Sequence, residues 1–145
     1  MPVSDDQVAT LRALLSDDMG RYRQLFSGLD RAEAKKGYSA LVTAGFAEAV
    51  ERRFGTGYRG GDIVEFVASV RSRSDQVAAE LDPDVAERVI RVVLEDAPVD
   101  DLSRDAITGA QLLLLIGLIA DAQLDCEGLD QFLAEARKLA DQLMN

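Results

Sequence analysis

Apolar residues recur at helical spacing along almost the whole chain. The first apolar stripe comes after Ser4, which with Gln7 three residues later has the spacing of a helical capping box, and Gly20 closes this segment. A short second stripe covers residues 22–29. The spacing therefore predicts two helices in the first 30 residues.

The middle of the chain is divided by glycine. Asp30 and Glu33 repeat the capping spacing, and Gly37 interrupts the segment that they begin. Residues 42–54 then carry a helical apolar pattern up to Phe54. Residues 55–61 are the one Gly-rich stretch, which indicates a turn between helices.

The second half contains four further helical segments. One apolar face covers residues 63–81, with a weaker centre at residues 72–75, and Asp62 can cap its start. Asp82–Pro83 marks a new helix start, because proline fits the first helical position after a capping residue. Pro98 ends that helix, since the residue before a proline avoids helical geometry.

The last two segments differ in pattern. A helix of about 102–124, capped by Asp100 or Asp101, is nearly all apolar at its centre, which predicts a central helix buried all round or an oligomer interface. Leucine dominates this centre, so a strand is disfavoured. An amphipathic C-terminal helix of about 127–144 completes the chain. Gly109 and Gly117 lie within the apolar helix, and they predict close approach by another helix.

These patterns together predict an all-α fold. We find no alternation typical of strands, no hairpin turn, no fixed-period repeat and no domain linker. The expected architecture is a single domain, residues 1–145, folded as a compact bundle of about six to seven helices. A chain of this length should bury roughly 68–70% of its unfolded surface, so it needs neither a disulfide nor a metal to fold.

Composition excludes several kinds of chemistry. The 145 residues include no histidine, which excludes Ser-His-Asp and Cys-His catalytic groups and histidine-ligated metals. The single cysteine, Cys126, cannot form an internal disulfide, and its acidic neighbours disfavour a reactive thiolate. Residues 112–120 form the longest apolar run, whereas a membrane span needs about 20 residues. We therefore expect a cytoplasmic protein with no membrane segment and no bound cofactor.

Charge is distributed unevenly over a chain whose net charge is −10. Residues 1–20 carry a net charge of −3, residues 21–73 of +4, and residues 74–145 of −11. A solvated surface that keeps the protein soluble explains this pattern most simply. Charge complementarity with a partner is the sharper alternative.

Two motifs raise the question of a ligand. A glycine loop before a helix can bind phosphate, but residues 55–61 lack a preceding strand and match neither nucleotide-binding spacing. Asp121 and Asp125 stand four residues apart and could share a helix face, yet the segment has no EF-hand pattern. The simpler interpretation is that Asp125 caps the last helix, so we predict no metal site.

The most favoured function is a non-catalytic protein–protein interaction or regulatory module. Its partner would be a protein, either a basic one that docks on the acidic half or a second copy in a homodimer through the helix at 112–119. A bundle that binds a small molecule or a divalent metal, including a carboxylate-based enzyme, is the alternative. A helix-turn-helix DNA binder using the basic middle is disfavoured by the net charge, so nucleic acid is not expected as a partner. The candidate interaction surface comprises Arg52, Arg53, Tyr58, Arg59, Arg71 and Arg73, with Asp96, Asp100, Asp101 and Asp105 as a second, acidic surface.

Overall fold

The structure is a computed structural model that describes residues 3–29, 32–96 and 98–144, without the side chains of residues 32–35. Within these residues the chain forms eight helices and no strand, so the all-α fold is confirmed and the expected count of six to seven is slightly low. The helices are α1 (Asp5–Leu15), α2 (Met19–Ser27), α3 (Ala32–Phe54), α4 (Gly60–Arg71), α5 (Asp75–Glu80), α6 (Pro83–Glu95), α7 (Arg104–Ala122) and α8 (Cys126–Met144).

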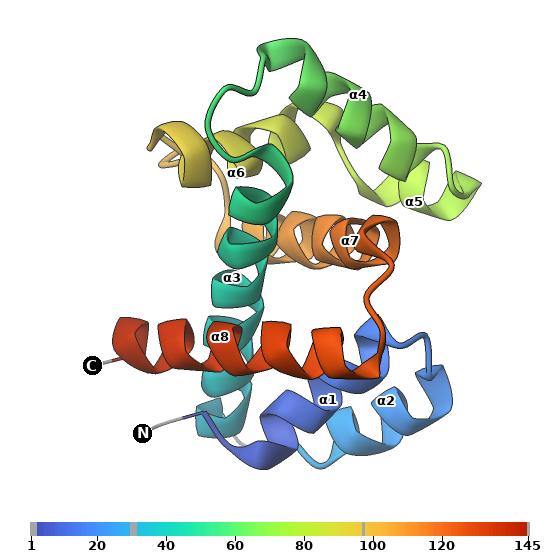
Figure 1. Cartoon of the computed structure of the whole chain (residues 1–145), viewed down its shortest axis with the longest axis vertical. Coiled ribbons are helices and arrows are strands. Elements are labelled where there is room, and N and C mark those ends of the chain that lie inside the picture. Colours follow the sequence, from blue (N-terminus) through green and yellow to red (C-terminus); the bar gives the residue numbers. More distant parts are fainter. Residues whose placement is uncertain (1–2, 30–31, 97, 145) are drawn as a thin grey trace.

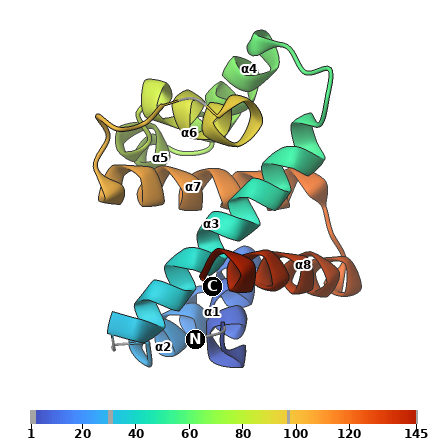
Figure 2. The same ribbon diagram turned by 90° about the vertical axis from the view of Figure 1, so that its left-hand side faces the viewer.

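Helix α3 runs through the molecule and joins its two halves (Figure 1). Helices α4, α5, α6 and α7 lie on one side, and α1, α2 and α8 lie on the other, as the view at 90° also shows (Figure 2). The most extensive helix contacts are those of α3 with α8 and with α7. Side chains from these two groups of helices can therefore meet on the C-terminal part of α3.

Several helix starts are where the sequence places them. Ser4 and Gln7 form the reciprocal capping box of α1, with the Gln7 N–H donating to Ser4 Oγ at 3.3 Å and the Ser4 N–H donating to Gln7 Oε1 at 2.8 Å. Asp82 caps α6 by accepting from two backbone N–H groups, and Pro83 is its first residue. The C-terminal helix begins one residue earlier than expected, at Cys126.

Two glycines predicted to interrupt helices, Gly20 and Gly37, lie inside helices instead. α1 ends at Leu15, so Gly20 lies inside α2, which starts behind a different cap, Asp18. Gly37 lies inside α3, where a Cβ atom would stand 2.5 Å from the Gln7 side-chain nitrogen. Glycine at this position permits α1 to cross close to α3 rather than interrupting the helix. The cap expected at Asp30 falls outside the described residues.

The apolar face at 63–81 is divided between two helices. α4 ends at Arg71, and Ser74 starts α5 by accepting a hydrogen bond from the Val77 N–H at 3.0 Å. The weak centre noted in the sequence is therefore a complete break. α7 is also capped differently from expectation, because Ser103 accepts from the Ala106 N–H at 3.1 Å in place of Asp100 or Asp101.

Helix α7 is not buried all round within this chain, so the first of its two predicted arrangements is wrong, whereas the oligomer interface stays a prediction. Leu114, Leu115 and Leu118 lie in the core, but one face of the helix is open. We name this the α7 open face; its apolar members are half-buried or exposed and comprise Gly109, Leu112, Leu113, Ile116 and Ala120. The two internal glycines therefore differ, because a Cβ at Gly117 would lie 2.8 Å from Val70 Cγ2, whereas one at Gly109 would meet nothing within 4 Å.

Among the described residues, α7 alone is long and apolar enough to cross a membrane by length and composition. About a third of it (33%) is buried within the protein. A single helix of this kind is weak support for a membrane span, because core helices of soluble proteins meet the same criterion.

Val3, just before α1, is fastened to α8. The Val3 N–H donates to Asp141 Oδ1 at 2.7 Å, and Arg137 Nη2 donates to the Val3 carbonyl at 2.6 Å. Arg137 also pairs with Asp5 at 2.7 Å through its other terminal nitrogen. These contacts join segments more than 130 residues apart and place α1 against α8.

Candidate functional site

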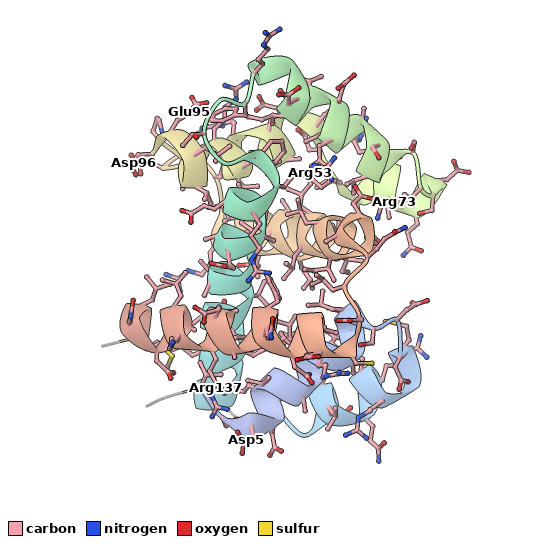
Figure 3. All side chains as sticks on the ribbon, in the orientation of Figure 1. Asp5, Arg53, Arg73, Glu95, Asp96 and Arg137 are labelled. Carbon is pink, nitrogen blue, oxygen red and sulfur yellow. The ribbon has the colours of Figure 1, made fainter. Side chains whose placement is uncertain are left out.

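Two of the predicted arginines, Arg53 and Arg73, lie on the same side of the molecule (Figure 3), and both pair with a single carboxylate. Arg53, near the end of α3, places Nη1 3.2 Å from Asp121 Oδ2, and Arg73, just beyond α4, places Nη2 2.6 Å from Asp121 Oδ1. Asp121 lies in the last turn of α7. Gly117, one turn earlier, permits this meeting because a side chain there would collide with Val70 of α4.

Arg52 and Arg53 are further positioned by aromatic rings. The Arg53 guanidinium carbon lies 5.0 Å from the Phe66 ring centroid, and that of Arg52 lies 5.1 Å from the Phe132 centroid. Arg52 also donates from Nε to Glu48 Oε1 at 2.9 Å. A guanidinium stacked on a ring keeps its edge N–H groups available to an anion, so these contacts fix the arginines without occupying all their donors. We call Arg52, Arg53 and Arg73 the arginine cluster.

A small cleft lies beside the arginine cluster, between α3, α7 and the start of α8. Its volume is about 280 Å³. We call it the α3–α7–α8 cleft; its lining combines two arginines and one carboxylate with apolar side chains, and comprises Ala49, Arg52, Arg53, Leu118, Ile119, Asp121, Ala122, Leu124 and Phe132. The cleft therefore presents positive charge next to an apolar wall.

A larger and more open groove lies on the other side of Arg53. Its volume is about 780 Å³, and it runs between the end of α3, the Gly-rich loop and α4. Aromatic, hydroxyl and acidic side chains predominate in its lining, which comprises Arg53, Phe54, Thr56, Gly57, Tyr58, Asp62, Glu65, Phe66, Ala68, Ser69 and Ser72. Arg53 is thus shared by both hollows, and the groove itself carries more negative than positive charge.

Tyr58 and Arg59 do not join the arginine cluster. The Tyr58 hydroxyl donates to Glu95 Oε2 at 2.6 Å, and this hydrogen bond raises the pKa of the half-buried phenol. The bond fastens the Gly-rich loop to the end of α6, where Arg91 also reaches Glu95 at 3.4 Å. Arg59 is exposed, and its backbone N–H donates to Asp62 at 2.9 Å at the start of α4.

Arg71 has a structural role instead of the exposed position expected from the sequence. Its side chain is half-buried, and it donates from Nε to the Leu81 carbonyl at 2.9 Å and from Nη2 to the Ala78 carbonyl at 3.0 Å. These carbonyls lie in and just after α5. Arg71 therefore holds α5 against the end of α4 and belongs to neither hollow.

The acidic surface is spread over the connection from α6 to α7. Asp96 ends α6 in the left-handed conformation, with φ of 56°, and Asp105 lies in the first turn of α7. Asp101 is paired within the chain: both of its oxygens accept from Arg88, one at 3.0 Å. This bidentate pair lowers the pKa of Asp101 below its usual value of 3.8. Asp96, Asp100 and Asp105 are the members of this surface that remain exposed without such a pair in the described structure.

The Arg88–Asp101 pair gives a prediction for pH. A carboxylate whose pKa is lowered by folding stabilises the protein above its unfolded pKa, and this contribution is lost as pH falls through the folded value. Asp101→Asn should therefore lower the urea midpoint at about pH 6, and its difference from the parent should shrink as the pH falls below 3.8 and vanish once it has passed the folded pKa of Asp101. Asp100→Asn, which removes an exposed neighbour, should show no such trend. Equal pH dependence in both variants would contradict the role of the pair.

Comparison with known proteins gives no match: no protein-family model, no curated protein and no solved structure is significantly similar to the chain.

Asp121 and Asp125, near the end of α7, both make polar contacts within the protein. Asp125 accepts from the Gly128 N–H at 2.7 Å and caps α8, as the sequence predicts, while Asp121 pairs with two arginines. In the part of the chain that the structure describes, no group of three or more acidic or cysteine side chains could hold a metal ion.

Sequence reasoning missed the residues that position the arginines. Phe66, Phe132 and Asp121 contact Arg53 or Arg52, and all are distant from them along the chain. Their apolar or capping patterns indicate core positions and a helix end, so nothing local connects them with a binding surface. The doublet Arg52–Arg53 at a helix end is the only local signal.

Proposed function

We propose that this chain is a single-domain, cytoplasmic, non-catalytic interaction module that binds a protein partner through the arginine cluster. The observation that carries the proposal is the convergence of Arg53 and Arg73 on Asp121, with Arg52 beside them. Three guanidinium groups face two carboxylates there, so positive charge is concentrated on one site of a chain whose net charge is −10. Such a site suits an acidic segment of a partner, because arginine forms directional hydrogen bonds with carboxylates.

The acidic half of the chain supports a second mode of association. Asp96, Asp100 and Asp105 lie exposed around the α6–α7 connection. Asp96 lies on a different part of the molecule from Arg53 and Arg73 (Figure 3). A basic partner would dock here, and charge complementarity would accelerate its association. In the homodimer alternative, a second copy would cover the α7 open face.

The arginine cluster can be tested by capture from the native lysate. We expect the tagged chain to retain a stoichiometric partner at low salt and to lose it as the ionic strength rises to about 0.3 M, because exposed charges are then screened. Arg52→Gln with Arg53→Gln should abolish this capture. Arg21→Gln with Arg23→Gln, which changes two exposed arginines on α2, is the matched control and should leave it intact.

Two results would count against the proposal. Retention of every captured protein by the Arg52→Gln, Arg53→Gln variant would exclude the arginine cluster as the contact. Recovery of the bait alone at low salt would exclude a stable partner under those conditions.

Arg71 is unsuitable for this test, because its hydrogen bonds hold α5 in place.

A further inference from the structure

The α3–α7–α8 cleft has features of a small-molecule site that a protein-docking surface does not require. We propose that it binds a monocarboxylic acid with a short aliphatic or single-ring tail, the tail entering the cleft and the carboxylate binding Arg52 and Arg53. The proposal goes beyond the protein partner proposed above, although both use these two arginines. The volume of the cleft, about 280 Å³, lies just below the usual range for ligand pockets, so the cleft suits only a compact ligand.

The inner wall of the cleft is apolar and belongs to the protein core. Leu118 is 4% exposed and Ile119 is 7% exposed, and Phe132 is fully buried beneath Arg52. Leu124 and Ala122 complete the wall where α7 gives way to α8. Because the three core residues expose almost no surface, a hydrocarbon tail would gain mainly by covering Leu124 and Ala122. A polar tail would lose hydration there without gaining hydrogen bonds.

The two arginines that line the cleft have N–H donors that make no hydrogen bond within the protein. A guanidinium group carries five N–H donors, of which Arg52 uses Nε for Glu48 and Arg53 uses Nη1 for Asp121. Within the described residues, the other donors of these two side chains form no hydrogen bond to protein. Stacking on Phe132 and Phe66 already orients both groups, so little side-chain freedom is lost when an anion binds.

Arg73 makes an anion tolerable at this site. Asp121 lines the cleft and would repel a carboxylate, but its second oxygen is held by Arg73 at 2.6 Å. Counting Glu48 and Arg73 with the lining residues, the site has three positive and two negative groups. An excess of one positive charge matches a monoanion better than a phosphate, which carries up to two negative charges at neutral pH.

The test is an NMR titration of the purified chain with hexanoate and with 3-phenylpropionate. We expect amide shifts confined to residues 49–53, 118–124 and 132, with saturation below about 10 mM. Hexanamide and hexylamine keep the tail and change the head group, so they should give no saturating shifts there. Arg52→Gln with Arg53→Gln should weaken hexanoate binding by about tenfold or more.

Two further variants separate a true site from general effects. Ala122 is exposed at the end of α7, so Ala122→Phe should fill the cleft and abolish binding without disturbing the core. Arg23→Gln, an exposed arginine on α2, should leave the affinity unchanged. Unchanged thermal unfolding of each variant, measured by circular dichroism, verifies that the fold is intact.

Three outcomes would overturn the proposal. The first is no saturating shift with either acid at about 10 mM. The second is equal shifts with hexanamide, or shifts spread over the α7 open face, which would indicate unspecific apolar binding. The third is binding of a short peptide with a free carboxyl terminus when neither acid binds, which would assign the cleft to a protein partner. The capture experiment tests the protein partner separately, so a failure of both acids to bind would not contradict the proposed protein partner.

Discussion

Replacement of Phe132 by alanine is expected to lower the free energy of unfolding by about 3–5 kcal/mol. The ring is fully buried, and it fills the crossing of α8 with α3, where a Cβ on Gly45 would lie 3.8 Å from Phe132 Cζ. Truncation would leave a cavity between the two helices with the most extensive contact in the molecule, and it would remove the ring beneath Arg52. Urea unfolding followed by circular dichroism measures this change.

The same helix supplies a control for the Phe132 variant. Leu143 is 59% exposed near the end of α8, so Leu143→Ala should change the free energy of unfolding by no more than about 0.5 kcal/mol. Because domains are typically stable by only about 5–15 kcal/mol, Phe132→Ala would remove a large part of the total. Similar losses in both variants would mean that α8 is held by its whole length and not by this crossing.

The second large effect is expected at Gly117. A Cβ there would lie 2.8 Å from Val70 Cγ2, which is buried and belongs to a β-branched side chain with little rotational freedom. Gly117→Ala should therefore lower the free energy of unfolding by about 1–3 kcal/mol, despite alanine's higher helix propensity. Thermal unfolding, with the enthalpy measured in the same scan, provides the value.

Gly109 is the matched position for this substitution, because it lies in the same helix and on the open face. Gly109→Ala should raise the free energy of unfolding by about 0.5–1 kcal/mol, since a Cβ there meets nothing and alanine stiffens the unfolded chain. The two substitutions should thus have opposite signs. Stabilisation by both would show that α4 moves away from α7 without cost.

The sequence predicts helix starts well where the signal is contained in a few neighbouring residues. The Ser4–Gln7 capping box, the Asp82–Pro83 start and the Asp125 cap are confirmed because each depends on a side chain three residues or fewer from the N–H group it binds. The break predicted at Gly37 is wrong because the role of this glycine is set by Gln7, a residue of another helix. Glycine serves both to end a helix and to let two helices pack closely, and the sequence alone does not distinguish these two roles.

The candidate site is predictable from the sequence only as a group of charges. Arg53 and Arg73 do lie together, but the reason is Asp121, which the sequence places in an acidic segment of another helix. Arg71 differs from Arg73 by two positions, and it turns inward to backbone carbonyls. Which of the two arginines reaches Asp121 is decided by the break between α4 and α5, which the apolar spacing indicates only as a weaker centre.

The packing of α8 on α3 has a consequence for how the chain is made. α3 is complete once Phe54 has been added, yet the helix that covers it ends about ninety residues later. At a translation rate of about 5–20 residues per second, this interval lasts roughly 5–18 s. During that time the face of α3 around Gly45 has no α8 to cover it. The nascent chain therefore carries an uncovered apolar face on α3 until α8 has been made.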